Sequence, residues 1–370
     1  MERVRQFLQL PDTGAPDGAN VRVAVIDSGI DQTHADLRHA TDGRRSKDCR
    51  PDHKDLTDRW AHGTAIAGII AGRGRLASGR YRGLAPAATL LIYKVFEGRE
   101  GVLEPDLQRA LQFAVRAKAD IINLSCSSSP LDDDALGGPI DRVQPPWVWS
   151  ASLRLGDYLL EATRCGVLCV VSAGNDGQHG RGTINRAGGS EGCLAVGACD
   201  LDGRHHPNSS RGPYYVDATL ERDRWRRLED SDRDAQIRVI KPDLVAPGVG
   251  VWTPLSAHSV DLRAEVLADP RSEGGAYYPF TGTSVAAAVV SGLAACTLGE
   301  VRKWRPTLPA RSQARLLLGL LREAARASCT SEAELEEMGN GVLRWPAIAA
   351  AIERCRSDEE YFRDLLNPPL

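Results

Sequence analysis

The stretch that decides the fold reads Val23-Ala24-Val25-Ile26-Asp27-Ser28-Gly29-Ile30. An uninterrupted apolar run of this kind, rich in β-branched residues, predicts a fully buried strand. The run ends in the carboxylate of Asp27, which is costly to bury unless it has a partner. The end of this strand is therefore a candidate for a functional site.

Further apolar runs alternate with stretches of helical spacing along the chain. Buried strands are expected at 21–26, 89–96, 120–125, 167–172 and 194–198. Helices are expected at 65–71, 104–118, 151–163, 285–295, 310–327 and 345–352. This alternation predicts an α/β fold in which a parallel β-sheet is sandwiched by α-helices.

Three other segments carry polar groups beside small residues. They read His62-Gly63-Thr64, Ser172-Ala173-Gly174-Asn175 and Gly282-Thr283-Ser284. With Asp27 they offer a hydroxyl nucleophile, a general base, a carboxylate to orient that base, and an amide donor for an oxyanion. Asp27 and Asn175 follow predicted strands, and sites in parallel sheets form at the carboxyl ends of strands. We therefore expect these groups to meet at one edge of the sheet.

At these residues the sequence resembles the subtilisin-like serine proteases, whose catalytic groups occur in the chain order Asp, His, Ser. The resemblance runs from about residue 21 to the segment at 339–343. It implies a subtilisin-like α/β fold with surface insertions, and a serine endopeptidase that hydrolyses peptide bonds through an acyl-enzyme. It assigns Ser284 as the nucleophile, His62 as the base, Asp27 as the orienting carboxylate and Asn175 as the oxyanion donor.

Each of these residues also has an ordinary structural interpretation. Ser284 could simply cap a helix, and Asn175 lies in a Gly-Asn-Asp-Gly sequence that is typical of a turn. Asp31 and Asp36 are alternatives to Asp27 as the orienting carboxylate. The family motif favours Asp27.

The resemblance also implies a substrate groove between two walls. One wall would pair with an extended peptide as an added strand, and it consists of Leu124, Ser125, Cys126 and Ser127. The facing wall consists of Ser172, Ala173 and Gly174. Asp176 would lie near the rim and favour a basic side chain. Many family members carry two glycines where this chain has Cys126 and Ser127, which predicts narrower outer subsites.

No cofactor is implied, and the sequence predicts no metal site. Family members that bind calcium tightly carry an Asn-rich loop after the histidine helix. In this chain the corresponding stretch, 73–80, contains Arg73, Arg75 and Arg80 and no carboxylate. Since calcium requires oxygen ligands, this stretch is a poor calcium site.

The sequence predicts a short N-terminal segment at 1–20, a catalytic domain at 21–354 and a C-terminal tail at 355–370. About 20 residues before the first strand are too few for a folded pro-segment. We expect neither a signal peptide nor an apolar run near the ~20 residues of a membrane span. The nine cysteines follow no ligand-like pattern, which favours a reducing, cytoplasmic location.

The net charge of −3 favours neither nucleic acid nor a membrane as a partner. A protein or peptide substrate is expected. Three surface insertions are expected at 127–152, 214–239 and 256–276. Their tryptophans, Trp147, Trp149 and Trp225, would anchor a regulatory protein partner or fasten each loop to the body. Two other functions stay open: a transpeptidase or macrocyclase in peptide maturation, and a catalytically silent binding scaffold.

Overall fold

A seven-stranded parallel sheet forms the centre of the protein. The computed structural model describes residues 1–11, 13–98, 102–126, 146–190, 192–217, 236–259, 269–326 and 331–366. The strand order is β2-β3-β1-β4-β5-β6-β9. The strands are β1 (Arg22–Asp27), β2 (Lys47–Asp48), β3 (Thr89–Lys94), β4 (Ile121–Leu124), β5 (Leu168–Ser172), β6 (Leu194–Cys199) and β9 (Leu244–Pro247). The predicted parallel sheet is confirmed.

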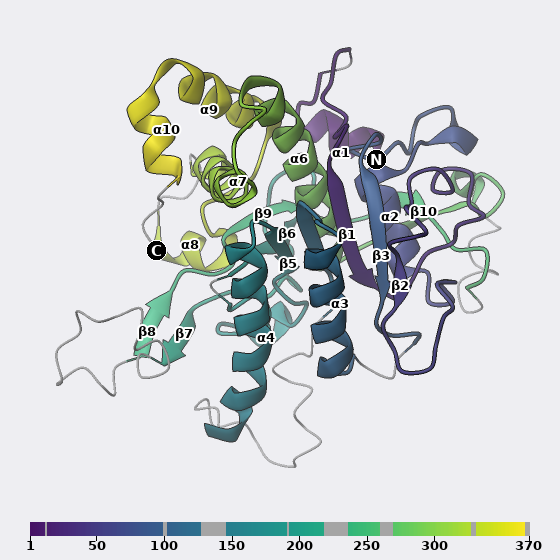
Figure 1. Ribbon diagram of the computed structural model, residues 1–370, viewed down its shortest axis with the longest axis horizontal. Helices are drawn as coiled ribbons and strands as arrows, with labels where there is room; N and C mark the ends of the chain where they lie inside the picture. The colour runs from purple at the N-terminus through teal and green to yellow at the C-terminus, as the bar shows by residue number, and fades with distance from the viewer. Residues whose placement is uncertain are drawn as a thin grey trace.

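Helices cover both faces of this sheet, and two antiparallel hairpins lie outside it (Figure 1). The helices are α1 (Glu2–Phe7), α2 (His62–Ala71), α3 (Glu104–Arg116), α4 (Pro146–Arg164), α6 (Thr283–Trp304), α7 (Ala310–Ala325), α8 (Glu332–Met338), α9 (Trp345–Ser357) and α10 (Glu359–Leu366). The hairpins pair β7 (Tyr214–Asp217) with β8 (Gln236–Val239), and β10 (Val251–Pro254) with β11 (Tyr277–Phe280).

The packing of strand β1 shows why its four central residues, 23–26, are all apolar. Val23 and Val25 pack into the core that includes α2 and α6. Ala24 and Ile26 belong to a second core, which includes α3 and α4. Because successive side chains of a strand point to opposite faces, a strand covered on both sides has no face left for polar residues.

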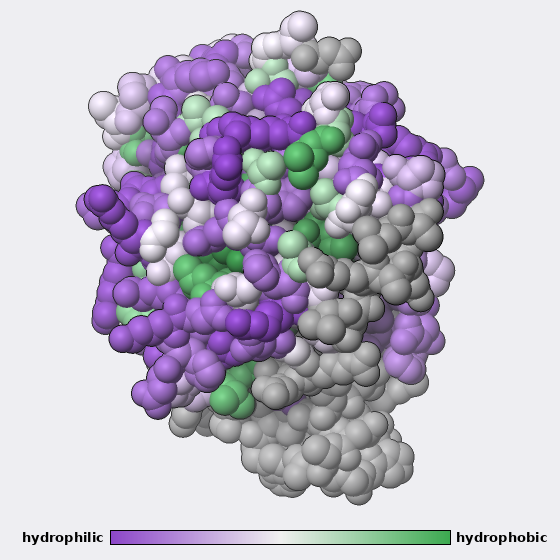
Figure 2. Space-filling model, turned by 90° about the vertical axis from the view of Figure 1, so that its right-hand side faces the viewer, coloured by the Kyte–Doolittle hydropathy of each residue, from purple (hydrophilic) through white to green (hydrophobic). Residues whose placement is uncertain are grey.

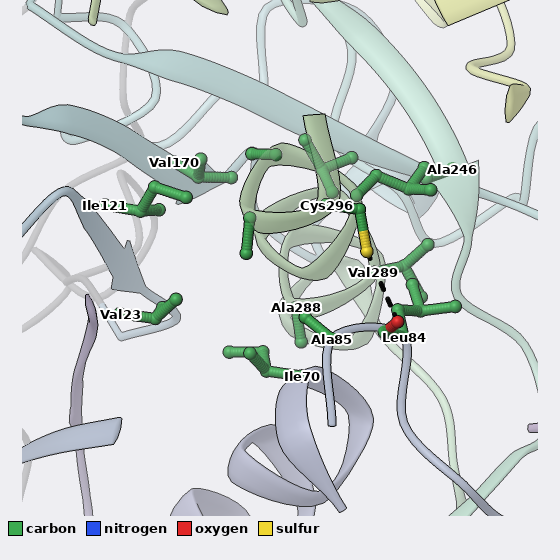
Figure 3. Packing of buried hydrophobic residues seen from close by; sticks show 14 of the residues in the cluster. Val23, Ile70, Leu84, Ala85, Ile121, Val170, Ala246, Ala288, Val289 and Cys296 are labelled. Atoms are coloured by element: carbon green, nitrogen blue, oxygen red, sulfur yellow. Dashed lines mark hydrogen bonds between the residues drawn. The ribbon is translucent and has the colours of Figure 1, made fainter. Parts of the chain in front are cut away.

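Helix α6 runs through the larger core. Its alanines and valines belong to this core: in Figure 3 Ala288 lies on the side of Ile70, and Val289 lies on the side of Leu84 and Ala246. Small side chains let this helix approach its neighbours closely. Within the described ranges, α6 is the one helix with the length and composition of a membrane span, and 89% of the apolar window is buried inside the protein. The expectation that no apolar run approaches this length is thereby corrected, although a buried core helix is weak evidence for a membrane.

Both ends of the described chain pack on the same body. Leu8 is buried, and its carbonyl accepts a hydrogen bond from the N–H of Trp345 at 2.9 Å. Near the other end, Phe362 of α10 is buried with its ring edge-on to Trp304. Residues expected as a tail are thus helical up to Leu366. The domain boundaries at 20 and 354 stay predictions.

Most of the expected insertions fall outside the described residues, including Ser127 and Trp225. Trp147 and Trp149 belong to α4. Where the surface is described, Figure 2 shows a largely hydrophilic face with hydrophobic residues in small separate groups. Scattered apolar residues of this kind are ordinary on a protein surface, so the described part of this face offers no single apolar docking area.

Candidate active site

The four predicted catalytic residues are brought together through three short contacts at the carboxyl ends of β1, β4 and β5. Asp27 is the last residue of β1 and contacts His62. Ser284 contacts Ser125, which follows β4. Asn175 comes shortly after β5 and contacts the residue that precedes Ser284. Since β4 lies between β1 and β5 in the sheet, the contacts belong to one site.

The imidazole of His62 is held by the carboxylate of Asp27. Its Nδ1 lies 2.8 Å from Oδ1 and 3.0 Å from Oδ2 of Asp27. A carboxylate can only accept, so Nδ1 carries the proton and Nε2 is the basic nitrogen. The Asp27 side chain is fully buried, whereas 23% of the His62 side chain is exposed. The imidazole is therefore held on its buried side by Asp27, and the rest of the ring is partly open to a substrate.

Burial by itself would lower the pKa of His62. The neighbouring carboxylates of Asp27 and Asp58 act in the opposite direction and outweigh it, so that the pKa of His62 is raised above its usual value. The imidazole is thus a stronger base than a free histidine.

A close approach of helix α2 to the end of β1 makes this contact possible. Gly63, the second residue of α2, lies so near the backbone of Gly29 that a Cβ on Gly63 would be 2.2 Å from the Gly29 carbonyl oxygen. Any larger residue at 63 would push the helix away. The glycine that follows His62 in the sequence is therefore a packing requirement.

The proposed nucleophile lies in the first turn of α6. Gly282 precedes the helix, and Ser284 is its second residue. A backbone N–H at this position has no acceptor within its own helix, so that of Ser284 can serve an anion. In this conformation the Ser284 hydroxyl donates to the carbonyl oxygen of Ser125 at 3.1 Å.

The side-chain amide of Asn175 is fixed by Thr283. Its Oδ1 accepts from the Thr283 N–H at 2.9 Å, and at 3.1 Å it shares the single proton of the Thr283 hydroxyl with the carbonyl of Gly174. Because both donors occupy the oxygen, the NH₂ group is the part of the amide left to bind something else. Sequence reasoning named Asn175 but missed Thr283, whose only signal is its place beside Ser284.

The two alternative carboxylates have other partners. Asp31 accepts from the N–H and hydroxyl of Thr33 and from the N–H of Ala257. Asp36 accepts from the N–H of Arg75 at 2.6 Å and from the hydroxyl of Tyr277 at 2.9 Å. Of the three candidate aspartates, Asp27 is thus the one in contact with His62.

The predicted groove residues differ in what they can offer. Leu124 is fully buried among core residues, so only its backbone is available to a substrate. Ser125 and Cys126 are also buried, and the thiol of Cys126 points to the carbonyl of Ile26 at 3.5 Å. Burial, together with the nearby Asp27 charge, raises the pKa of this thiol well above its usual value. Ser127 lies outside the described residues.

The facing wall is held by its own hydrogen bonds. The carbonyl of Ser172 accepts from the Asn185 amide at 2.8 Å, and the N–H of Ala173 donates into β6. Gly174 adopts a φ of +112°, which only glycine takes readily. Asp176 is exposed. The substrate-binding roles of both walls remain predictions.

The arginine-containing stretch at 73–80 lies against the N-terminal helix, where the N–H of Glu2 donates to the carbonyl of Arg80 at 3.0 Å. Among the described residues, no group of three or more His, Cys, Asp or Glu side chains is arranged to hold a metal ion.

Comparison with known families gives a match over most of the chain. The model of the subtilase family matches residues 18–341. Serine protease AprX of Bacillus subtilis is 29% identical over 292 residues, covering 76% of this chain and 58% of that protein. The membrane-bound transcription factor site-1 protease of Mus musculus is 28% identical over 295 residues, covering 79% of this chain and 22% of that protein. The chain thus spans about a fifth of one relative and just over half of the other.

Solved structures give the same fold. A lanthipeptide protease aligns over 95% of this chain and 95% of its own, with a TM-score of 0.68 and 21% identity. The patellamide maturation protease PatA aligns over 90% of this chain and 97% of its own, with a TM-score of 0.59 and 22% identity. At this level of identity the similarity concerns the fold alone.

Proposed function

We propose that this chain, which belongs to the subtilase family of serine proteases, is an endopeptidase that acts through an acyl-enzyme on Ser284. The observation that carries the proposal is the contact between Nδ1 of His62 and the buried carboxylate of Asp27, because it leaves Nε2 as the base on the side of the site open to a substrate. The first step requires the Ser284 hydroxyl to rotate from the Ser125 carbonyl toward Nε2 of His62. Hydrogen bonds of this kind are often absent or long until substrate is bound.

The proposed reaction then follows from the positions of these groups. Oγ of Ser284 attacks the scissile carbonyl carbon while its proton moves to Nε2 of His62. The carbonyl becomes an oxyanion, which accepts hydrogen bonds from the Asn175 NH₂ group and the Ser284 N–H. His62 gives its proton to the leaving amine, the C–N bond breaks, and the acyl-enzyme remains. Water, deprotonated by His62, then releases the acid product and restores the Ser284 hydroxyl.

Rotation of the Ser284 hydroxyl has a second effect. It frees the carbonyl of Ser125, which is the first residue after β4. That carbonyl would accept a hydrogen bond from the backbone N–H of an extended peptide, as in the addition of a strand. Substrate binding and activation of the nucleophile would then be coupled through one oxygen atom.

Fluorophosphonate labelling tests the nucleophile. The wild-type chain should form a covalent adduct on Ser284, and Ser284→Ala should abolish it. An adduct that persists in the alanine variant would place the nucleophile elsewhere. A wild-type chain that stays unlabelled would favour the silent scaffold. Masses of the products from a peptide substrate separate hydrolysis, which adds water, from transfer of the acyl group to an amine, which does not.

We also propose a reducing, cytoplasmic location for this protease. Eight cysteines in the described residues are free thiols, and seven of them are buried. Buried thiols that pack as small apolar groups are typical of proteins from reducing compartments. Mass measurement after alkylation under native and denaturing conditions tests this, since a disulfide in the isolated native protein would contradict it.

Control by a protein partner is a further part of the proposal. One expected insertion directly follows Cys126, and loops beside a cleft can block or complete it. A partner-controlled enzyme should show low basal activity that the partner raises. If the purified chain alone cleaves proteins with a kcat in the usual range of about 1–10³ s⁻¹, no partner is needed.

A further inference from the structure

A second buried carboxylate, Asp58, lies at the start of the helix that carries His62. It is fully buried. Its Oδ1 accepts from the N–H groups of Trp60 at 3.0 Å and Ala61 at 2.9 Å. Its Oδ2 accepts from the N–H of Thr64 at 2.8 Å and from the Thr64 hydroxyl at 2.6 Å. Asp58 thus satisfies backbone groups on both sides of His62.

The same carboxylate is tied to the strand that carries Asp27. The hydroxyl of Ser28, which follows Asp27, donates to Oδ1 of Asp58 at 2.8 Å. The Ser28 oxygen in turn accepts from the N–H of Gly63 at 2.9 Å. Ser28 is therefore connected to the helix in two ways. It donates to Asp58, which in turn accepts from Thr64, and it accepts directly from Gly63.

Capping of a helix end does not by itself account for this arrangement. The residue at the N-cap of α2 is Ala61, which has no side-chain acceptor and is buried with a φ of +68°. That conformation is strained for a residue with a Cβ. The two acceptors that satisfy the helix N–H groups come from outside the helix, from Ser28 and Asp58. The start of the helix is thus fixed by the end of β1.

We propose that Asp58 is a positioning residue, which fixes the His62 imidazole against Asp27 and holds a second negative charge near it. The proposal rests on the function proposed above, because it matters only if His62 acts as the base. All five donors to the Asp58 carboxylate are neutral N–H or O–H groups. Its charge therefore has no cation among these partners to cancel it, and it acts on the imidazole.

The charged groups near His62 are few. Among the described residues, the carboxylates of Asp27 on β1 and Asp58 in the preceding loop are the charges that raise its pKa. On the side of β4, the thiol of Cys126 has a raised pKa and stays neutral at physiological pH. Removal of the Asp58 charge should accordingly move the pKa of His62 downward.

The test separates charge from structure and does not depend on catalysis. In the Ser284→Ala chain, the pKa of His62 is measured by NMR titration with and without Asp58→Asn. We expect Asp58→Asn to lower it. The control is Asp31→Asn, which removes another buried carboxylate with N–H and O–H donors. Its Oδ1 also lies 3.7 Å from Nε2 of His258, and it is not among the charges acting on His62. This variant should lower the melting temperature and leave the pKa of His62 in place.

Activity measurements follow in chains with Ser284 intact. Asp58→Asn should reduce kcat at least tenfold, toward the ~10²-fold that a small misplacement of a reacting group costs, with KM little changed. The acid limb of its pH profile should move to lower pH. Ser28→Ala keeps the charge but removes the link between strand and helix, so it should reduce kcat without moving that limb.

Three results would overturn the proposal. The first is an unchanged pKa of His62 in the Asp58→Asn variant, with only the melting temperature lowered. The second is an equal shift in the Asp31→Asn control. The third is a Ser28→Ala variant with unchanged kcat. Failure of the proposed function is distinct, since it would appear as an unlabelled wild-type chain, whatever the NMR titration gives.

Discussion

The two halves of the active site are built differently. Asp27 and His62, on β1 and α2, are already in contact and are held by a dense set of buried hydrogen bonds through Ser28 and Asp58. The proposed nucleophile half, on α6, has the Asn175 amide held by Thr283, but the Ser284 hydroxyl donates to the Ser125 carbonyl. The contact between Asp27 and His62 is already formed, whereas the proposed mechanism requires the Ser284 hydroxyl to rotate away from Ser125.

The serine half of the proposed site can rearrange more easily than the histidine half. Moving the base would require breaking buried contacts to a carboxylate, which are expensive to leave unmade. Moving the nucleophile requires only a rotation about one side-chain bond of Ser284. Substrate binding can therefore change the orientation of the Ser284 hydroxyl at little cost, whereas the contact between Asp27 and His62 exists before the substrate binds.

The largest effect within the serine half is expected from the oxyanion donor. Asn175→Ala should lower kcat by about 10²–10³ with KM little changed, because the amide acts on charge that develops in the transition state. Thr283→Val, which removes one of the two anchors of the Asn175 oxygen, should cost less. Equal losses in steady-state kinetics would mean that Thr283 acts in some way other than orienting the amide. An unchanged kcat in Asn175→Ala, with chemistry shown to be rate-limiting, would contradict the donor role.

The pH profile tests the preformed half. His62 must be neutral to accept a proton, so kcat/KM should fall about tenfold per pH unit below its pKa. Because Asp27 and Asp58 raise that pKa, the midpoint should lie above the ~6.5 of a free histidine. The sign for stability is the reverse: the charged imidazole stabilises the fold below ~6.5, and this contribution is lost as the pH rises through the higher folded pKa. A midpoint at or below that of a free histidine would contradict the raised pKa of His62 and the role of the two carboxylates in it.

The smallest effect is expected from chelation. In the proposed site, hydrogen bonds between protein groups position both the histidine half and the serine half. Asp36, the carboxylate beside the arginine-containing stretch, is already occupied by the Arg75 N–H and the Tyr277 hydroxyl. Chelator should leave both the activity and the melting temperature nearly unchanged. A melting temperature that falls by many degrees would reveal a metal that supports one of the halves.

The sequence was most informative where a residue's surroundings are local. The buried strands and helix α2 follow from apolar runs and small residues, and the motif positions of Asp27 and His62 lead to their contact. Strand β9 was not predicted, since its four residues end in Pro247, and proline is typical of edge strands and not of strand interiors. Helix α6 was expected to stop at 295 but continues to Trp304, through polar residues whose helical state depends on tertiary packing.

The parts of the site that escaped prediction depend on distant partners. Asp58 reads as an ordinary turn residue until Ser28 is brought against it, and Thr283 gains a role only through Asn175. Nor does the sequence give the hydrogen bond from the Ser284 hydroxyl to the Ser125 carbonyl, because a side-chain rotamer is set by the folded surroundings. The sequence thus indicated which residue types the site contains, but it did not predict the hydrogen bonds that orient their side chains.

The burial of α6 bears on when the proposed peptidase activity would appear during synthesis. During synthesis Asp27 and His62 leave the ribosome long before Ser284, which begins a helix that fits only into an already assembled core. A half-made or half-folded chain would therefore lack the proposed nucleophile in position, and it would have no peptidase activity. Because domains of this kind fold as cooperative units, the same dependence acts in reverse. A molecule that begins to unfold should lose its cutting ability at the moment when it becomes a substrate for its neighbours.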